Sequence, residues 1–596
     1  MALRELNSFR DAIARATHWT RTQLARIPHR LGRRTGEKVL VNLLARVPNR
    51  GKLADVKAKI LWSLLNDRAE AMRIARSALA RAPRNRALIA SLARMEIEAD
   101  SYHDAEMRLR GALDDLGAAG GTRQLWQLVS LLTYALLHQG KSADAWTLLS
   151  SGPGTLLPVD QVRFLQAHVC RYTQRYDEAE DIYAQVLAQK PNDIWALWEL
   201  AELLSLRGKL AAAEPLHRRI SRIAGDPTFN ARNHSHCLLA QGRIREGWAR
   251  NLVRVENSEL KKLEGVRVWD GSDLATRSIF VIVEGGTGDE LRDAVCYREL
   301  SERAAEVTIA CDPRLETLLK RSFPRVKTWP TGRTERVSGV NRRLSRLIDE
   351  ATLEEVRRHD FCVVSPDLFY FFKPEAEDYG KPSPYLQPDP KLAAHWRQRL
   401  AALGPGPKVG IAWSTIRQNY RTFSYYTKLA EWGPLLTQPG LIFVNLQYGD
   451  CVDELTKAEQ RFGVRIHRWP DLDLLNDFDS VAGLIAGLDL VLAPNSTTLE
   501  LAGALGAPAW YMVNEYQTLD HFRLMDRATR QDRCYPSVRI FMARQPGDST
   551  SLIAQVAGEL ERTFGMASDS DQESVVGKQD ASVPGRGGTS AAPARR

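Results

Sequence analysis

Residues 60–250 read as one helix after another, and a single spacing recurs through them. Alanines stand 34 residues apart in three pairs, which are Ala71 with Ala105, Ala145 with Ala179, and Ala179 with Ala213. Glycines at 140, 208 and 242 follow the same grid, since they are 68 and 34 residues apart. The irregular step of 40 residues, from 105 to 145, contains the Gly-rich stretch 115–123 (DLGAAGGTR), which accounts for the extra six. A chain with this period is expected to stack like units, because no single unit buries its apolar face alone.

A 34-residue period with a small residue, an apolar position four residues later and a closing proline is typical of tetratricopeptide repeats. The small residue lets the two helices of a unit pack closely. Pro83 and Pro191 each follow a grid alanine by twelve residues and end a helix. We therefore predict a solenoid over residues 51–255, with a concave surface that binds an extended protein segment. An unrelated helical bundle with chance spacing is the alternative.

Charge and composition exclude several classes of protein. Lys and Arg number 82 against 72 Asp and Glu, so the net charge of +10 permits acidic ligands such as phosphates. No nucleic-acid-binding module is recognised, and we expect no nucleic-acid partner. No apolar run is long enough for a transmembrane helix, and the N-terminus lacks the apolar core of a secretory signal. The seven cysteines are scattered without a CxxC pair, which suits a reducing compartment, and we expect a cytoplasmic protein.

The two ends of the chain differ from the rest in composition. Residues 20–38 are rich in Arg, and we interpret residues 1–50 as a basic cap on the solenoid. A patch for a membrane surface or a nucleic acid is the alternative reading. Residues 566–596 are Ser, Gly, Ala, Pro and charged residues with almost no apolar side chains, so we expect a disordered tail.

The second half alternates short apolar runs with helical stretches. Strands are expected at 278–284, 307–310, 362–365, 408–413, 441–446, 488–493 and 509–513. Buried strands separated by helices indicate parallel sheets covered on both faces. The Pro-rich stretch 381–390 (KPSPYLQPDP) divides them, so we predict two αβα domains over 265–385 and 391–565. A ligand-binding cleft is expected where the carboxyl ends of the strands of the two domains face each other.

The first candidate site follows the strand expected at 278–284. The loop consists of Gly285, Gly286, Thr287, Gly288 and Asp289, and it opens a helix. Small residues allow a tight turn, and free backbone N–H groups at a helix start favour an anion or a sugar oxygen. The pattern is neither GxGxxG nor a Walker loop, so dinucleotide and ATPase readings are weak. Asp289 is either a functional carboxylate in the cleft or an ordinary helix cap.

Two further stretches follow strand ends in the second α/β domain. Polar residues open the helix after 488–493, and they are Asn495, Ser496, Thr497 and Thr498. Hydroxyls and N–H groups at one helix start suit a diphosphate, and an ordinary capped helix is the alternative. After 408–413 the stretch 413–421 (WSTIRQNYR) carries Trp413, Arg417 and Arg421. The two arginines either bind phosphate in bidentate fashion or lie in solvent.

The order of these motifs resembles a known protein family. The repeats are followed by GRIREGW (242–248), GGTGD (285–289), PYLQPDP (384–390), KVGIAW (408–413), NSTTLELAGALGAPAW (495–510) and CYPSVRIF (534–541). This order resembles bacterial tetratricopeptide-repeat glycosyltransferases of the GT-B fold. These are similar to heptosyltransferases and more distantly to O-linked GlcNAc transferases. The resemblance covers roughly residues 60–560 and implies an all-α solenoid followed by a GT-B pair of αβα domains.

The resemblance also implies a role for each motif. Asp289 would be the general base that deprotonates an acceptor hydroxyl, beside an acceptor loop formed by Gly285, Gly286, Thr287 and Gly288. The donor's phosphates and leaving nucleotide would be held by Trp413, Arg417, Arg421, Asp479, Asn495, Ser496, Thr497 and Thr498. For Asp479, which lies ahead of a donor-side helix, a helix cap is an equal rival. No Asp-x-Asp motif lies at a strand end, so neither a metal nor another cofactor is expected.

The predicted function is therefore transfer of a sugar from a nucleotide-sugar donor to Ser or Thr hydroxyls of a protein held by the repeats. Flagellin is the first candidate, because some members of the class modify it. Family members commonly show Asp-Thr and His where this chain has Asn495-Ser496 and Glu500. A glutamate beside a phosphate is electrostatically unfavourable, so a donor of different charge, such as a CMP-linked sugar, would suit this site better than the usual UDP-linked sugar. We expect a donor that is either UDP-linked or CMP-linked. A repeat scaffold with a degenerate, inactive transferase domain is the alternative.

Overall fold

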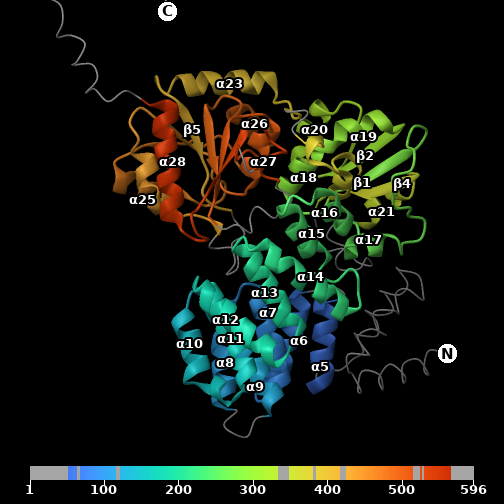
Figure 1. The fold of residues 1–596 in the computed structure, drawn as a ribbon, viewed down its shortest axis with the longest axis vertical. Coiled ribbons are helices and arrows are strands. Elements are labelled where there is room, and N and C mark those ends of the chain that lie inside the picture. Colours follow the sequence, from blue (N-terminus) through green and yellow to red (C-terminus); the bar gives the residue numbers. More distant parts are fainter. Residues whose placement is uncertain are drawn as a thin grey trace, which may run out of the picture.

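The chain folds into a helical stack and two α/β domains (Figure 1). A computed structural model describes residues 51–63, 68–115, 121–332, 348–379, 384–415, 425–514, 524–526 and 529–565. The two α/β domains lie side by side, and the helical stack lies below both in this view. The predicted basic cap at 1–50 and the predicted tail at 566–596 lie outside the described residues.

The helical stack confirms the repeat prediction. Its helices are α5 (Gly51–Ser63), α6 (Arg68–Arg81), α7 (Arg86–Glu98), α8 (Tyr102–Asp114), α9 (Thr122–His138), α10 (Ser142–Ser150), α11 (Val159–Tyr172), α12 (Tyr176–Gln189), α13 (Ile194–Leu206), α14 (Leu210–Ala224), α15 (Ala231–Ala240), α16 (Ile244–Asn251) and α17 (Val255–Leu260). The expected insert falls between α8 and α9, where α8 ends at Asp114 and α9 begins at Thr122. None of the described helices is long and apolar enough to cross a membrane.

The five grid alanines lie in the second helix of each unit, and all of them are fully buried: Ala71, Ala105, Ala145, Ala179 and Ala213. The next position on the grid is Gly247, 34 residues after the last alanine. A Cβ atom there would lie 2.6 Å from Leu239 Cγ, so the last crossing is too tight even for alanine. Close approach of the backbones, rather than helix propensity, therefore explains the period.

The turns inside the units repeat as well. Five residues before each of the last five grid positions, the backbone adopts a left-handed conformation, at Asp100, Gly140, Gln174, Gly208 and Gly242. The glycines adopt it without steric cost, whereas φ values of 61° at Asp100 and 60° at Gln174 are unusual for residues with a side chain. The turn geometry is thus the same in each unit, and only three of the five turns use glycine.

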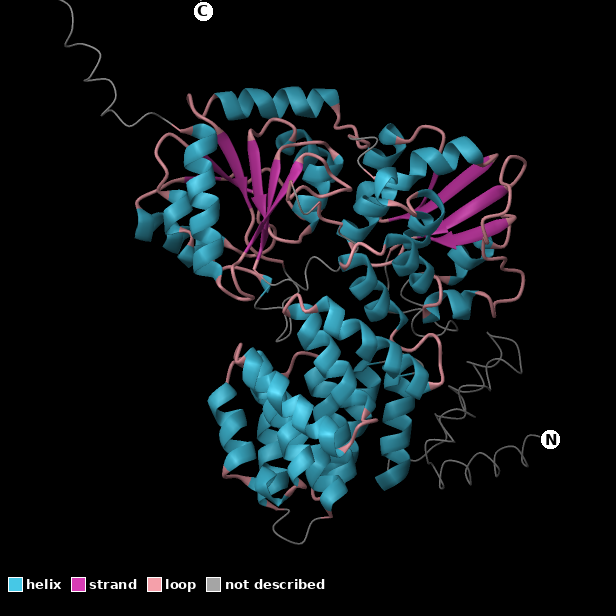
Figure 2. Cartoon of the chain, in the orientation of Figure 1, coloured by secondary structure: helices cyan, strands magenta, loops and turns pink. Residues whose placement is uncertain are grey.

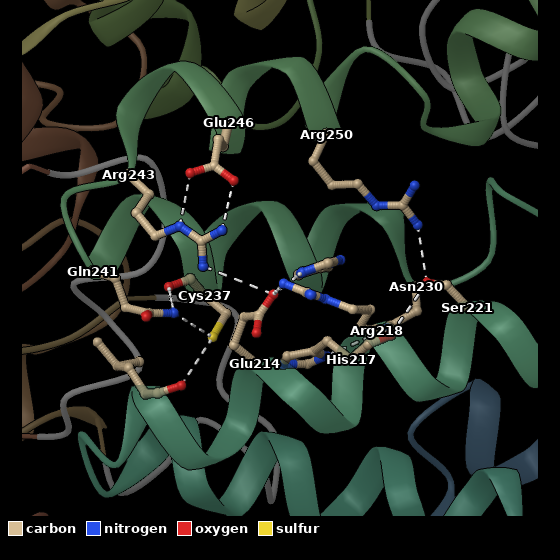
Figure 3. A network of polar contacts seen from close by, with 12 residues as sticks. Glu214, His217, Arg218, Ser221, Asn230, Cys237, Gln241, Arg243, Glu246 and Arg250 are labelled. Atoms are coloured by element: carbon tan, nitrogen blue, oxygen red, sulfur yellow. Dashed lines mark hydrogen bonds and ion pairs between the residues drawn. The ribbon is translucent and has the colours of Figure 1, made fainter.

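Neighbouring units are linked by a repeated side-chain contact. The residue after a grid alanine meets a basic residue four positions before the next grid position. The pairs are Glu106 with Lys141 at 2.7 Å, Glu180 with Lys209 at 2.8 Å, and Glu214 with Arg243 at 3.8 Å. Where the acidic residue is replaced by Trp146, the guanidinium of Arg175 lies 4.5 Å from the ring centroid. Figure 3 shows the last of the ion pairs, between α14 and α16.

The first α/β domain contains a four-stranded parallel sheet of order β3-β2-β1-β4. Its strands are β1 (Ser278–Ile282), β2 (Glu306–Cys311), β3 (Lys327–Pro330) and β4 (Phe361–Val364). The helices are α18 (Thr287–Asp293), α19 (Tyr297–Arg303), α20 (Glu316–Ser322), α21 (Glu350–Val356) and α22 (Leu368–Phe372). Strand β1 is central and buried, so the loop that follows it opens at the middle of the sheet edge.

The second α/β domain contains a six-stranded parallel sheet of order β10-β9-β8-β5-β6-β7 (Figure 2). Its strands are β5 (Lys408–Ile411), β6 (Ile442–Asn445), β7 (Ile466–His467), β8 (Leu490–Ala493), β9 (Ala509–Val513) and β10 (Val538–Met542). The helices are α23 (Pro390–Ala401), α24 (Gly433–Leu436), α25 (Val452–Phe462), α26 (Phe478–Ile485), α27 (Thr497–Ala504) and α28 (Ser549–Phe564). Two αβα domains after a helical solenoid confirm the predicted fold class.

All seven predicted strands are present, and three observed strands were not predicted. The missed strands are β3, β7 and β10, and each lies at the edge of its sheet. An edge strand has a neighbour on one side only, so it does not need the continuous apolar run of a central strand. Strand β3 (KTWP) is half-exposed along its length, and β7 has only two residues.

The last repeat unit is fused to the first α/β domain. Trp248 of α16 is fully buried and stacks on Phe369 of α22, with ring centroids 4.7 Å apart. Its indole N–H donates to the hydroxyl of Tyr379 over 2.8 Å. Beside it, Arg254 lies buried between the carboxylates of Glu284 and Asp367, which follow strands β1 and β4. The solenoid therefore ends inside the core of the domain that carries the first candidate site.

Candidate functional site

The loop after β1 is shaped by Gly285 and Asp289. Gly285 has a φ of +86°, and a Cβ atom on it would lie 2.7 Å from Asp289 Cγ. The carboxylate of Asp289 folds back over this glycine, and its Oδ2 accepts the N–H of Gly286 over 2.6 Å. Asp289 is thus a capping residue in the first turn of α18, as one of the two readings of the sequence expected.

The same carboxylate is also half-exposed. Its Oδ1 accepts a hydrogen bond from Arg292 over 2.8 Å, and its side chain is 40% exposed whereas that of Arg292 is only 2% exposed. A capped, half-exposed carboxylate with a fixed orientation is suited to accept a proton from a bound hydroxyl. Capping and chemistry are therefore compatible roles for Asp289.

The polar residues that begin α27 lie in the second domain. Ser496 is the N-cap, and its hydroxyl accepts the N–H of Leu499 over 3.4 Å. Thr498 is buried, with its hydroxyl 3.5 Å from the carbonyl of Leu446. Asn495 and Thr497 are half-buried. The backbone N–H groups of the first turn, together with Thr497, make this helix start suited to an anionic group.

The structure brings these two candidate sites together. Helix α18 packs against helix α27, and Gly288 lies at the point of contact. A Cβ atom on Gly288 would lie 3.4 Å from Thr497 Cα and 3.2 Å from Glu500 Cγ. The third glycine of the GGTGD loop therefore permits close contact between the domains, and Asp289 lies one residue from that contact.

Glu500 does not occupy the place that the sequence suggested. It was expected beside a donor phosphate, but its side chain is only 3% exposed. Its Oε2 accepts the hydroxyl of Tyr535 over 2.7 Å, and its Oε1 lies 3.8 Å from Arg292. The glutamate is thus neutralised inside the protein, and the electrostatic objection to a diphosphate donor no longer holds.

The remaining predicted donor residues lie in different surroundings. The side chain of Trp413 is 1% exposed in the core, and its indole N–H donates to Glu454 over 3.1 Å, so it presents no face to a ligand. Asp479 forms an ion pair with Arg321 of α20 in the other domain. The cap of α26 is Asp477, whose side chain accepts the N–H of Ser480. Arg417 and Arg421 lie outside the described residues.

Sequence analysis missed a polar group on the other side of the loop. Arg314 follows β2, and its Nη2 donates to the hydroxyl of Thr287 over 2.8 Å and to Asp312 over 2.7 Å. Its Nη1 reaches the carbonyl of Leu475 in the second domain over 2.8 Å. The one available signal was the position of Asp312 and Arg314 after the strand expected at 307–310, since carboxyl ends of parallel strands share one edge.

One buried acid near the loop is held neutral. Asp293 lies one turn after Asp289, and burial raises its pKa to about 8, although Arg292 and Ser365 act in the opposite direction. The hydroxyl of Ser365 donates to its Oδ2 over 2.6 Å. At neutral pH this carboxyl adds little negative charge to the site, so Asp289 is the exposed anion of the loop.

Among the described residues, no group of three or more His, Cys, Asp or Glu side chains is placed to hold a metal ion. The Asp-x-Asp sequence at 471–473 is engaged in other contacts. Arg399 binds both oxygens of Asp471, and Asp473 accepts the backbone N–H groups of Leu475 and Asn476.

Comparison with known proteins gives one family match and one curated relative. A family model described as a tetratricopeptide repeat matches residues 173–231. Protein FlbA of Caulobacter vibrioides is 34% identical over 330 residues, which are 54% of this chain and 53% of that protein. The chain thus spans about half the length of this curated relative.

Similar solved structures include several glycosyltransferases. A family 9 glycosyl transferase from Veillonella parvula covers 49% of this chain and 98% of its own at 9% identity and a TM-score of 0.35. The ADP-heptose lipopolysaccharide heptosyltransferase II of E. coli covers 50% and 100% at 15% identity and a TM-score of 0.33. An O-GlcNAc transferase mutant from Thermobaculum terrenum covers 74% and 93% at 14% identity and a TM-score of 0.25. With TM-scores below 0.5, these likenesses carry no argument about the reaction. The chain joins tetratricopeptide repeats to a pair of α/β domains with parallel sheets.

Proposed function

We propose that the protein is a glycosyltransferase that transfers a sugar from a nucleotide-sugar donor to Ser or Thr hydroxyls of a protein held by the repeats. The observation that carries this proposal is the contact at Gly288. It places the half-exposed carboxylate of Asp289 beside the start of α27, where Thr497 and backbone N–H groups can bind an anion. A base for a hydroxyl and a cradle for a phosphate are the two elements that a sugar transfer of this kind requires.

In this mechanism Asp289 accepts the proton of the acceptor hydroxyl as its oxygen attacks the anomeric carbon of the donor. The bond from that carbon to the donor phosphate breaks, and the nucleotide leaves with the electron pair. The positive end of α27 stabilises the charge on the departing phosphate. We propose that no metal takes part, and we expect full activity after treatment with EDTA.

The repeats support a protein acceptor. They end in the domain that carries Asp289, through the buried contacts of Trp248 and Arg254, so a segment bound along them is held at a fixed position relative to the loop. We propose flagellin as the first acceptor to test and the cytoplasm as the site of the reaction. Because Glu500 is neutralised internally, both UDP-linked and CMP-linked sugars stay candidate donors.

The test is intact-mass analysis of flagellin produced with and without this chain. A mass increment equal to a whole number of sugar residues is expected only with the chain present, and mapping should place it on Ser or Thr. Asp289→Ala should lose the increment, with at least a hundredfold lower rate. Asp548→Ala is the matched control, since Asp548 also caps a helix, α28, by accepting the N–H of Ser551.

The control variant should lose about 1 kcal/mol of stability and keep its activity. Unmodified flagellin in every combination would overturn the choice of acceptor, and equal activity of Asp289→Ala would overturn the base. A thermal-shift series with UDP-, GDP- and CMP-sugars tests the donor separately. No stabilisation by any of them would favour the scaffold alternative, for which Asn495 stays the one argument from sequence.

A further inference from the structure

Arg292 is a buried cation shared by the two α/β domains. Its side chain is 2% exposed, and it meets Asp289 at 2.8 Å in the first domain and Glu500 at 3.8 Å in the second. Burial alone would lower the pKa of Arg292, but the negative charges of Asp289 and Glu500 raise it well above its ordinary value. The guanidinium therefore stays charged, and the carboxylates around it share its electrostatic attraction.

Glu500 itself is held by two tyrosine hydroxyl groups that link it to α18. Tyr535, which precedes β10, donates to Glu500 over 2.7 Å. The hydroxyl of Tyr385, between the two domains, lies 3.2 Å from that of Tyr535 and 2.8 Å from the carbonyl of Leu291 in α18. These hydrogen bonds hold Glu500 against α18, the helix that carries Asp289, while the side chain of Glu500 stays buried.

The contact between Glu500 and Arg292 requires the domains to be in contact. The contact lies beside Gly288, because a Cβ atom on Gly288 would be only 3.2 Å from Glu500 Cγ. Separation of the domains would take Glu500 away and leave Arg292 with Asp289 and Asp293, of which Asp293 is held mostly neutral by burial. The attraction of Arg292 would then act mainly on Asp289 and make it a weaker base.

We propose that Glu500 is a positioning residue that, through Arg292, makes Asp289 a stronger base while the two α/β domains are in contact than when they are apart. This inference rests on the proposed function, in which Asp289 accepts the acceptor proton. It makes the strength of the base depend on the domain that holds the donor. Among the described residues, the titratable groups around Arg292 and its partners include Asp289, Asp293, Glu284, Glu500, Tyr385 and Tyr535.

The test measures how firmly Asp289 holds its proton, without donor or acceptor. Carbodiimide with glycine ethyl ester labels protonated, accessible carboxyl groups. Mass spectrometry of the full chain, labelled over a series of pH values, gives the extent of labelling of each carboxyl group. The pH of half-maximal labelling is the midpoint for that group. Asp289→Asn identifies the signal. In Glu500→Gln the amide oxygen still accepts the hydroxyl of Tyr535 but the charge is gone. We expect the Asp289 midpoint to fall by about one pH unit, a tenfold weaker affinity for the proton.

Two further variants separate charge from structure. Glu561→Gln removes an exposed carboxylate from α28 and should leave the midpoint unchanged. Gly288→Leu should push α18 and α27 apart and lower the midpoint as Glu500→Gln does. An unchanged or higher midpoint in Glu500→Gln overturns the proposal, and an unchanged midpoint in Gly288→Leu overturns its dependence on domain contact.

The outcome is independent of whether transfer is observed. A shifted midpoint in a protein that transfers no sugar would keep the coupling and overturn the proposed function. In an active enzyme, Glu500→Gln should move the acidic limb of the pH–rate profile to lower pH by the same amount and reduce kcat at its plateau. A merely structural role of Glu500 would lower the rate without moving that limb.

Discussion

Gly285 combines a left-handed backbone with a missing side chain, and both are needed to place Asp289. We predict that Gly285→Ala destabilises the protein by about 1–3 kcal/mol, since the new Cβ atom meets Asp289 and φ is +86°. Displacement of the carboxylate should also reduce transfer at least tenfold. Urea unfolding and the mass-increment assay measure the two effects.

Gly286 provides the control for this prediction. It has an extended backbone with φ of −90°, and a Cβ atom on it would come no closer than 3.6 Å to Asp289. Gly286→Ala should therefore change stability by less than about 0.5 kcal/mol and leave Asp289 in place. Equal losses in the two alanine variants would show that the loop tolerates no substitution and that the geometry of Gly285 is not the reason.

At the scale of residues, sequence analysis located Asp289 and the start of α27 because each directly follows a buried strand. It did not locate Arg292 or Arg314, whose partners include residues more than 150 positions away in the other domain. It also misjudged Trp413 and Glu500, which lie close in sequence to the cleft but point into the core. Direction and burial of a side chain depend on tertiary contacts that no local pattern records.

At the scale of elements, the repeat period was predictable because it is set by backbone contact. Each grid alanine is a position where any larger side chain would separate two helices, so the constraint is visible in one residue type at one spacing. The left-handed turns were only partly visible, since Asp100 and Gln174 replace glycine at two of them. Three of the four edge strands were not visible, because one-sided pairing leaves their composition less constrained. The fourth, β4, was predicted because it is an apolar and mostly buried run.

The junction between the last two repeat units contains two stacked histidines, His217 of α14 and His234 of α15, with ring centroids 5.9 Å apart. Burial lowers the pKa of His217 to about 4, and the amide of Asn230 lies 3.1 Å from its Nδ1 (Figure 3). The folded state therefore keeps this ring neutral at pH values where the unfolded chain, with a pKa of 6.5, is already protonated.

The sign of the resulting pH dependence follows directly. The contribution of His217 is fully present above about pH 6.5 and is lost as the pH falls. The lost stability reaches roughly 3 kcal/mol at about pH 4. We predict that His217→Gln loses less stability than the parent protein between pH 7 and pH 5 in urea unfolding. The exposed His395 is the control, and His395→Gln should follow the parent curve. Parallel curves for His217→Gln and the parent would contradict the prediction.

At the scale of the whole molecule, one apolar core joins the last repeat unit to both α/β domains. It runs from Leu239 and Trp248 through the first sheet to residues of α27 and β9 in the second. Buried charges lie along the same junction, where Arg254 meets Glu284 and Asp367. The repeats are therefore not an independent module, although their period could be read from the sequence alone. The fusion could not be read, because it depends on Phe369 and Tyr379, more than 100 residues further along the chain.

Loss of the indole at this junction should therefore destabilise two regions at once. We predict that Trp248→Ala costs about 3–5 kcal/mol, the range expected for a large buried aromatic side chain. Hydrogen exchange should accelerate in α15 and in strands β1 and β4 together, because the cavity opens in a shared core. Trp195→Ala is the matched control, since this indole is 59% exposed and its loss should cost less than about 1 kcal/mol. Faster exchange confined to α15 and α16 would contradict the shared core, and it would mean that the repeats and the α/β domains unfold as separate units.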